Sequence, residues 1–199
     1  MNDRSRSRKP HYFIVALLTI VLGTVAWINF NGGWSGSRSG AGDDGLKPMP
    51  SIQLPKSDGA QIKTSDWKDE VLVVHFWAAW CPPCIPEIAE ILKAAKRLPK
   101  DKSGRKIHWL LVSQDPDWAK AHSILPESAL PEGVTSVLDS EAKVSDSFGS
   151  YQFPETYLIT REGKIAAKWI GAQEWSGNWG EHALQGIETL SREGHVPGQ

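Results

Sequence analysis

The chain has 199 residues, and its 22 Lys and Arg against 23 Asp and Glu give a formal net charge of −1. This balance implies neither a nucleic-acid partner nor a strongly acidic one. Ten residues are tryptophan. We expect most of them to fill the core, because aromatic side chains bury large areas.

The N-terminus combines a basic flank with an apolar segment. Residues 1–11 carry four Lys or Arg residues, and the 19 residues from 12 to 30 are uncharged and largely apolar. Such a run is long enough to cross a bilayer as a helix, and the basic flank is expected to stay in the cytoplasm. We therefore predict a cytoplasmic tail (1–11) and a transmembrane anchor (12–30) in the inner membrane.

A cleavable signal peptide is the alternative for this segment, because Thr24–Ala26 loosely fits a small-residue cleavage site. The apolar run continues past Ala26 to Phe30, which favours the anchor, and Trp27 and Trp34 suit a membrane interface. Under either interpretation, the rest of the chain is exported to the periplasmic or extracytoplasmic side.

Residues 31–45 are rich in Gly and Ser, which predicts a flexible linker. One domain of ordinary size then spans residues 46–199. We expect it to be a monomer.

The domain is predicted to begin with a hairpin. A turn signal at 57–60 separates short strands at 51–54 and 61–63, and Ser65 or Asp66 is expected to cap a helical turn that carries Trp67. Further strands are expected at 71–77, 106–113, 134–138, 156–160 and 165–170, and helices at 85–98, 141–148 and 178–192. Asp115-Pro116-Asp117 is expected to open another helix, with Pro116 in its first turn. This order predicts an α/β fold with a mixed sheet and helices on both faces.

The only two cysteines, Cys81 and Cys84, lie between the predicted strand 71–77 and the predicted helix 85–98. Two sulfurs one helical turn apart can close a small disulfide ring. The positive end of a helix dipole and free backbone N–H groups stabilise a thiolate there, so we expect Cys81 to be nucleophilic. In an exported protein, a lone C-x-x-C pair points to redox chemistry rather than to a structural crosslink.

A metal chaperone is the alternative use of the cysteine pair. Copper(I) prefers soft thiolate ligands, and a third ligand would come from His75, His108 or His182. None of them lies at a recognisable ligand spacing from the cysteines. A structural zinc site needs four ligands, and the sequence lacks a second C-x-x-C or paired histidines. We therefore expect no metal and no cofactor besides the Cys81–Cys84 disulfide.

The sequence resembles the thioredoxin superfamily, and within it the membrane-anchored thiol:disulfide oxidoreductases of cytochrome c maturation and their TlpA/ResA-like relatives. The matching residues are 74–84 (VHFWAAWCPPC), Glu87 and 153–159 (FPETYLI), and the resemblance covers about residues 46–190. It implies a thioredoxin-like fold and thiol:disulfide exchange with exported protein substrates. It also implies a reductant role, with apocytochrome c as a candidate substrate and a membrane thiol reductase as electron donor.

The resemblance assigns a role to each matching residue. Cys81 corresponds to the attacking thiol and Cys84 to the resolving thiol. Pro154 corresponds to a cis-proline that faces the disulfide, although its position alone favours an ordinary strand-entry proline. Substrate contacts are implied at Trp80, Pro82, Phe153, Glu155 and Thr156.

Three positions near the cysteines are expected to tune the chemistry. Glu87 matches an acidic residue that would exchange a proton with Cys84, the alternative being a solvated helix glutamate. His75 stands where thioredoxins bury an aspartate; it is either a proton shuttle or a hydrogen-bonded core residue, and we expect the second. Pro83, with Pro82, removes backbone donors near Cys81, which favours a more reducing pair.

Two points stay open from the sequence. Relatives often have a proline shortly after the acidic residue, whereas here Pro86 precedes Glu87, which leaves the approach of Glu87 to Cys84 undetermined. Trp175 and Trp179 form either a partner-docking ridge or a cap of the last helix against the sheet.

Overall fold

The computed structural model describes residues 46–100 and 104–194, which belong to one compact unit. The predicted tail (1–11), anchor (12–30) and linker (31–45) lie outside the described residues. Within the described ranges, no helix is both long and apolar enough to span a membrane.

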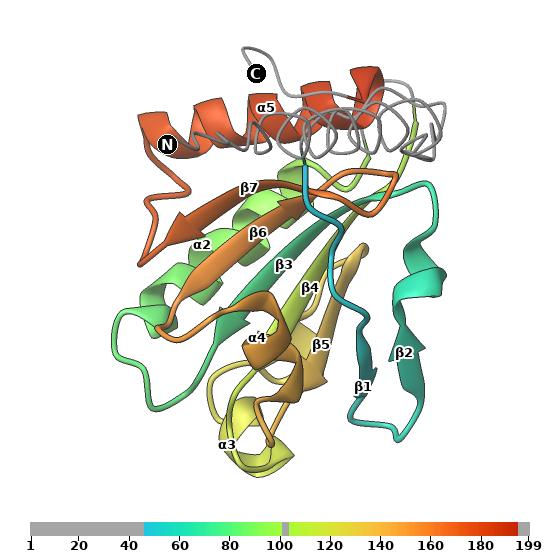
Figure 1. Cartoon of the computed structure of the whole chain (residues 1–199). Coiled ribbons are helices and arrows are strands. Elements are labelled where there is room, and N and C mark those ends of the chain that lie inside the picture. Colours follow the sequence, from blue (N-terminus) through green and yellow to red (C-terminus); the bar gives the residue numbers. More distant parts are fainter. Residues whose placement is uncertain (1–45, 101–103, 195–199) are drawn as a thin grey trace, which may run out of the picture. The chain divides into compact units, whose positions relative to one another are not determined.

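The described residues include a central five-stranded sheet with the order β5-β4-β3-β6-β7 (Figure 1). Strands β3, β4 and β5 are parallel, and β6 and β7 are antiparallel to their neighbours, so the predicted mixed sheet is confirmed. The strands are β3 (Val71–Trp77), β4 (Ile107–Ser113), β5 (Val134–Leu138), β6 (Glu155–Ile159) and β7 (Ile165–Ile170).

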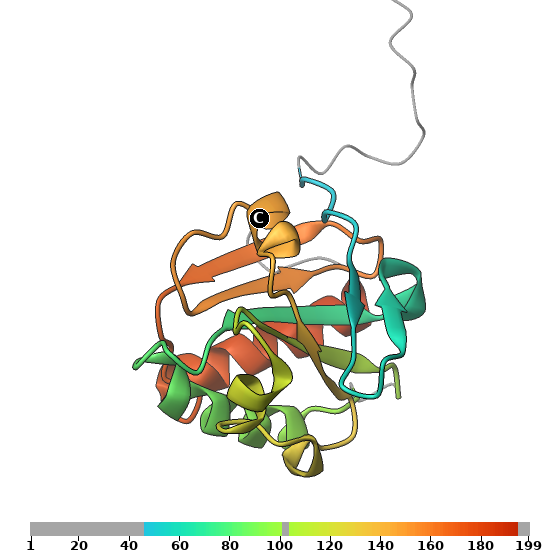
Figure 2. The same cartoon turned by 90° about the horizontal axis from the view of Figure 1, so that it is seen from below.

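Helices cover both faces of the sheet, as predicted (Figures 1 and 2). Helices α2 (Cys84–Arg97) and α5 (Asn178–Glu193) lie on one face, and α4 (Lys143–Phe148) lies on the other together with the hairpin of β1 (Gln53–Pro55) and β2 (Gln61–Lys63). The remaining helical elements are α3 (Trp118–His122) and the 3₁₀ turns η1 (Thr64–Trp67) and η2 (Glu127–Ala129).

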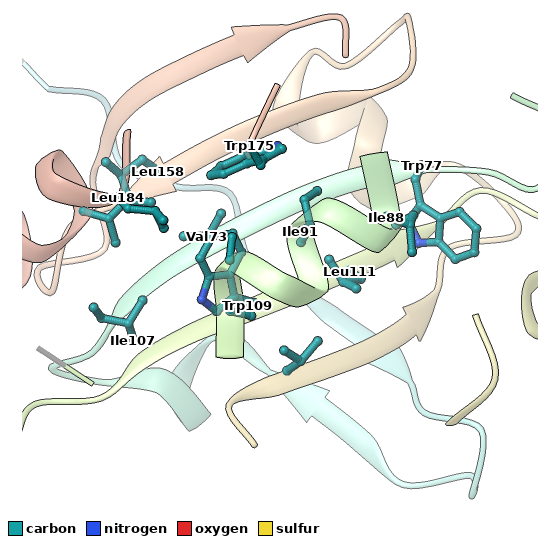
Figure 3. Close-up of a cluster of buried hydrophobic side chains, with 14 of the residues drawn as sticks. Val73, Trp77, Ile88, Ile91, Ile107, Trp109, Leu111, Leu158, Trp175 and Leu184 are labelled. Carbon is teal, nitrogen blue, oxygen red and sulfur yellow. The ribbon is translucent and has the colours of Figure 1, made fainter. Parts of the chain in front are cut away.

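Strand β3 is the centre of the sheet and is buried along its whole length. Val73 and Trp77 belong to the cluster that packs under α2 and α5 (Figure 3), whereas Val74 and Phe76 belong to the cluster under α4 and the hairpin. A strand that is buried on both faces needs a continuous apolar run, which is the pattern that the sequence shows. The two cysteines follow shortly after this fully buried strand.

Two predicted helix starts are wrong in detail. Lys63, not Ser65 or Asp66, is the N-cap of η1, because Asp66 is inside the turn and its carboxylate accepts the Lys63 backbone N–H at 2.8 Å. Pro116 is not in the first turn of α3; Asp117 is the N-cap, and its side chain accepts the Lys120 N–H at 2.8 Å. A short acidic side chain that can accept a backbone N–H sets the start in both cases.

Candidate functional site

The cysteine pair lies at the junction of β3 and α2. Cys81 and Cys84 are joined by a disulfide, with their Cα atoms 5.4 Å apart. The Cys81 N–H donates to the Ala78 carbonyl at 3.1 Å, and the Cys84 N–H donates to the Cys81 carbonyl at 3.1 Å. Two consecutive tight turns therefore carry the chain from the strand into the helix, which begins at Cys84. Cys84 is fully buried, and Cys81 is slightly exposed.

Few backbone donors remain for a thiolate at Cys81. Pro82 and Pro83 have no N–H, and Pro83 is the N-cap of α2. The N–H of Cys84 already donates to the Cys81 carbonyl. Hydrogen bonds that stabilise a thiolate lower its pKa. The two prolines thus remove part of the stabilisation that a helix N-terminus otherwise gives to a thiolate.

Asp115 anchors the loop in front of Cys81, and sequence reasoning missed this role. Its carboxylate is fully buried and accepts the Ala79 N–H at 3.1 and 3.0 Å and the Ser113 hydroxyl at 2.8 Å. A signal was available: Ser113 pairs with Trp77 at the ends of two parallel strands, and side chains just past such ends meet at one sheet edge.

The side chains of Trp80 and Phe153 form an aromatic surface beside the disulfide, which we call the aromatic wall. Trp80 is 59% exposed, and its ring lies edge-on to the ring of Phe153 with the centroids 5.8 Å apart. Pro82 is also exposed. The Phe153–Pro154 peptide bond is cis, so the cis-proline that the resemblance implied is confirmed. Residues from two distant segments thus form one surface next to Cys81.

The structure corrects the expectation that Glu155 and Thr156 contact substrate through their side chains, because both are buried. Glu155 forms an ion pair with Lys168 at 3.1 Å and accepts the Tyr157 hydroxyl at 3.2 Å. Thr156 Oγ1 lies 2.9 Å from Nδ1 of His75. Both residues begin β6, which is paired with β3 on one side and with β7 on the other, so their side chains lie on opposite faces of the sheet.

Glu87 is buried on the first turn of α2, with 3% of its surface exposed, so the alternative of a solvated helix glutamate is wrong. Its Oε1 accepts the backbone N–H of Gln173 at 3.1 Å and the indole N–H of Trp175 at 2.9 Å. Its Oε2 is buried without a partner among the described residues. Burial raises the pKa of Glu87 to about 7, against the lowering effect of these two hydrogen bonds. A carboxyl with such a pKa can exchange a proton near neutral pH.

Glu87→Gln is expected to stabilise the oxidised protein increasingly as the pH rises. The folded-state pKa of Glu87, about 7, lies above its ordinary value of 4.5. Its contribution to stability is therefore complete below pH 4.5 and is lost as the pH rises through 7. Urea unfolding between pH 5 and 8 should show the variant gaining about 3 kcal/mol relative to the wild type. Glu162→Gln, which removes an exposed carboxylate, is the control; equal pH dependence of both variants would contradict the expectation.

His75 is a core residue in this structure. Its side chain is fully buried, its Nδ1 is hydrogen-bonded to Thr156, and its Nε2 has no partner among the described residues. Burial lowers the pKa of His75 to about 3, so the ring is neutral at physiological pH. This placement agrees with the hydrogen-bonded core interpretation.

The other histidines considered as metal ligands are also engaged elsewhere. His108 Nε2 lies 3.0 Å from Thr135 Oγ1, and His182 Nδ1 lies 2.7 Å from the Asn178 carbonyl. In residues 46–100 and 104–194, no group of three or more His, Cys, Asp or Glu side chains is arranged to hold a metal ion.

The segment 171–179, whose two tryptophans the sequence left open, lies against this site: Gln173 and Trp175 both contact Glu87. Trp175 is 1% exposed, and its ring lies edge-on to those of Trp109, Trp169 and Trp179. Trp175 and Trp179 therefore cap the last helix against the sheet. Sequence reasoning missed Gln173 and Trp175 as partners of Glu87, because nothing in their spacing signals a contact with α2.

Comparison with known proteins gives matches over most of the described domain. Residues 45–182 match the model of a family described as Redoxin. The chain is 33% identical over 135 residues to the thiol:disulfide interchange protein DsbE of Allochromatium vinosum, covering 65% of this chain and 70% of that protein. It is 24% identical over 160 residues to the thiol-disulfide oxidoreductase ResA of Bacillus subtilis, covering 79% and 84%. Among solved structures, a thiol-disulfide oxidoreductase from Bacteroides fragilis has a similar fold, with a TM-score of 0.57, 24% identity and coverage of 69% and 99%.

Proposed function

This chain belongs to the Redoxin family of thioredoxin-like proteins and is a thiol:disulfide oxidoreductase of the DsbE/ResA type, and we propose that it reduces disulfides in exported proteins. The observation that carries the proposal is the Cys81–Cys84 pair at the start of α2, beside the exposed ring of Trp80. A pair in this position can take up and release two electrons without a bound cofactor.

Reduction of a substrate proceeds in two exchange steps. The Cys81 thiolate attacks one sulfur of the substrate disulfide, a mixed disulfide forms, and the first substrate thiolate leaves. The Cys84 thiolate then attacks Cys81 Sγ, and the second substrate thiolate leaves while the Cys81–Cys84 disulfide forms. Two electrons pass from the pair to the substrate. Cys81 is the attacking residue because it is the more exposed cysteine.

Glu87 is the proton acceptor for the resolving step. It lies three residues after Cys84 on α2, so the two side chains share one helix face. With a pKa of about 7, its carboxyl can take the Cys84 proton and pass it to the leaving thiolate or to solvent.

The aromatic wall receives the substrate. Trp80 and Phe153 offer apolar surface for residues that flank a substrate cysteine. Within the described residues, the backbone N–H and C=O of Phe153 take part in no hydrogen bond, so an extended substrate segment can pair with them.

The lack of backbone donors around Cys81 supports the reducing direction. Thiol-disulfide proteins that are strong oxidants have a stabilised reduced form. A less stabilised thiolate at Cys81 therefore makes the reduced pair a better electron donor. We propose exported proteins with paired cysteines, such as apocytochrome c, as substrates, and a membrane thiol reductase as the source of electrons. The anchor at 12–30 would hold the monomeric domain at the periplasmic face of the membrane.

The reduction potential of the Cys81–Cys84 pair tests this direction. We expect a value near that of thioredoxin, about −270 mV, when the full chain is equilibrated with glutathione or dithiothreitol buffers. Pro82→Ala and Pro83→Ala each restore a backbone donor, so each should raise the potential by tens of mV, about 30 mV for a tenfold change in the equilibrium constant. A wild-type value near −120 mV, the potential of a strong oxidant, would contradict the reductant role.

A further inference from the structure

Segment 171–177 supplies hydrogen-bond donors to two carboxylates of α2. Besides the two bonds to Glu87, the Ser176 N–H donates to Glu90 Oε2 at 3.3 Å. A groove of about 270 Å³ runs between this segment and the helix, and Glu87, Glu90 and Glu174 contribute to its lining. The segment therefore holds the carboxylates of Glu87 and Glu90, which lie on the first two turns of the helix that begins at Cys84.

Trp175 is the best fixed residue of this segment. Its ring centroid lies 5.4 Å from that of Trp109, 6.0 Å from Trp169 and 5.1 Å from Trp179, each in an edge-to-face arrangement. Figure 3 shows Trp175 and Trp109 in the cluster that also holds Ile88 and Ile91 of α2. Packing on several sides leaves the indole one orientation, so the direction of its N–H is set by the core rather than by solvent.

The two oxygens of Glu87 are in different surroundings. Oε1 accepts two N–H donors, one from the Gln173 backbone and one from the Trp175 indole. Oε2 is equally buried and has no partner in the part of the chain that the structure describes. A carboxyl oxygen that already accepts two hydrogen bonds is a poor site for a proton. The proton of the neutral acid therefore belongs on Oε2.

We propose that Trp175 is a positioning residue for disulfide exchange: its indole N–H holds Oε1 of Glu87 and leaves Oε2 as the oxygen that accepts and releases the proton of the reaction. This inference rests on the proposed function of Glu87. Trp175 acts through Glu87 alone and takes no part in the sulfur chemistry. Because an N–H donor favours the charged carboxylate, Trp175 also keeps the carboxyl a stronger acid than burial alone would allow.

The charges around Glu87 are few. Helix α2 contributes Cys84 and Glu90, whose negative charge raises the pKa of Glu87, and segment 171–177 contributes Glu174. On the packed sheet side, β3 contributes His75, which is neutral above about pH 3. The two N–H donors are thus the contacts that favour ionisation of Glu87.

The test is a titration of the Glu87 carboxyl in variants of the full chain. The carboxyl carbon is followed by ¹³C NMR in the oxidised protein, and its signal is assigned by its loss in Glu87→Gln. Trp175→Phe removes the N–H, and replacement of Trp175 by 3-benzothienylalanine removes it while keeping the bicyclic shape, so the second variant remains informative if the first fails to fold. Trp109→Phe is the matched control, because its buried indole N–H has no partner among the described residues.

Both Trp175 replacements are expected to make Glu87 an acid about tenfold weaker, a pKa rise of about one unit, and Trp109→Phe is expected to leave it unchanged. The pH profile of exchange should move with the carboxyl. An unchanged Glu87 pKa in the folded Trp175 variants, or an equal rise in Trp109→Phe, would overturn the inference. If Glu87→Gln leaves the pH profile of exchange unaltered, the proposed proton path fails instead, while the titration still decides the role of Trp175.

Discussion

Cys81→Ser is expected to abolish disulfide reduction, lowering the rate by about a thousandfold or more, whereas Cys84→Ser is expected to stop the reaction halfway. Serine at position 81 has no thiolate and cannot form the mixed disulfide. Serine at position 84 leaves the first attack intact, so the substrate stays bound to Cys81. Mass spectrometry of the reduced variants mixed with a peptide disulfide measures the covalent adduct, and stopped-flow measurements give the rate.

The two variants are controls for each other because they differ in one sulfur. The proposed order of attack requires the adduct on Cys84→Ser and none on Cys81→Ser. The opposite distribution would mean that Cys84 attacks first, which its complete burial argues against. If both variants formed the adduct to the same extent, the local structure would not distinguish the two thiols.

Gly180→Ala is expected to destabilise the protein by about 3 kcal/mol. Gly180 lies in the first turn of α5, directly against the backbone of Trp175. A Cβ at this position would lie 2.0 Å from the Trp175 carbonyl oxygen and 2.3 Å from its carbonyl carbon. Backbone atoms cannot rotate away from such a contact, so α5 or segment 171–177 must move. Urea unfolding measures the loss of stability, and the Glu87 titration should change with it.

Gly186→Ala is the matched control on the same helix. A Cβ at Gly186 has no heavy atom within 4 Å apart from its own chain surroundings. Alanine is the better helix former, so this variant is expected to be up to about 1 kcal/mol more stable than the wild type. If Gly180→Ala were as well tolerated as Gly186→Ala, the close packing of α5 on Trp175, and with it the fixed direction of the indole, would be incorrect.

Local sequence patterns were sufficient to predict the strand and the helix that flank the cysteine pair. The apolar run of β3 and the amphipathic α2 are each continuous in sequence, so the position of Cys81 and Cys84 between them could be read directly. The strand limits of β5 and β7 were also predicted correctly. The cis bond before Pro154 could not come from local pattern; the resemblance to thioredoxins supplied it.

The support of the site depends on contacts between distant segments, and sequence reasoning missed them. Asp115 is 36 residues from Ala79, and Trp175 is 88 residues from Glu87. The Asp115 contact had a signal in the sequence, because Asp115 lies just past the end of one of two neighbouring parallel strands. No spacing in the sequence signals the contact between Trp175 and Glu87. For Glu155, the sequence did not reveal that Lys168 on the neighbouring strand would neutralise a buried carboxylate. Burial, which decides whether such a side chain can meet a substrate, follows only from the assembled sheet.

A trapping experiment tests most directly whether Cys81 passes electrons to exported proteins. Cys84→Ala in the full chain, expressed in living cells, leaves Cys81 able to form a mixed disulfide that nothing resolves. We predict covalent adducts with exported proteins that carry paired cysteines, and none in the Cys81→Ala/Cys84→Ala control. The absence of any Cys81-dependent adduct would contradict the account.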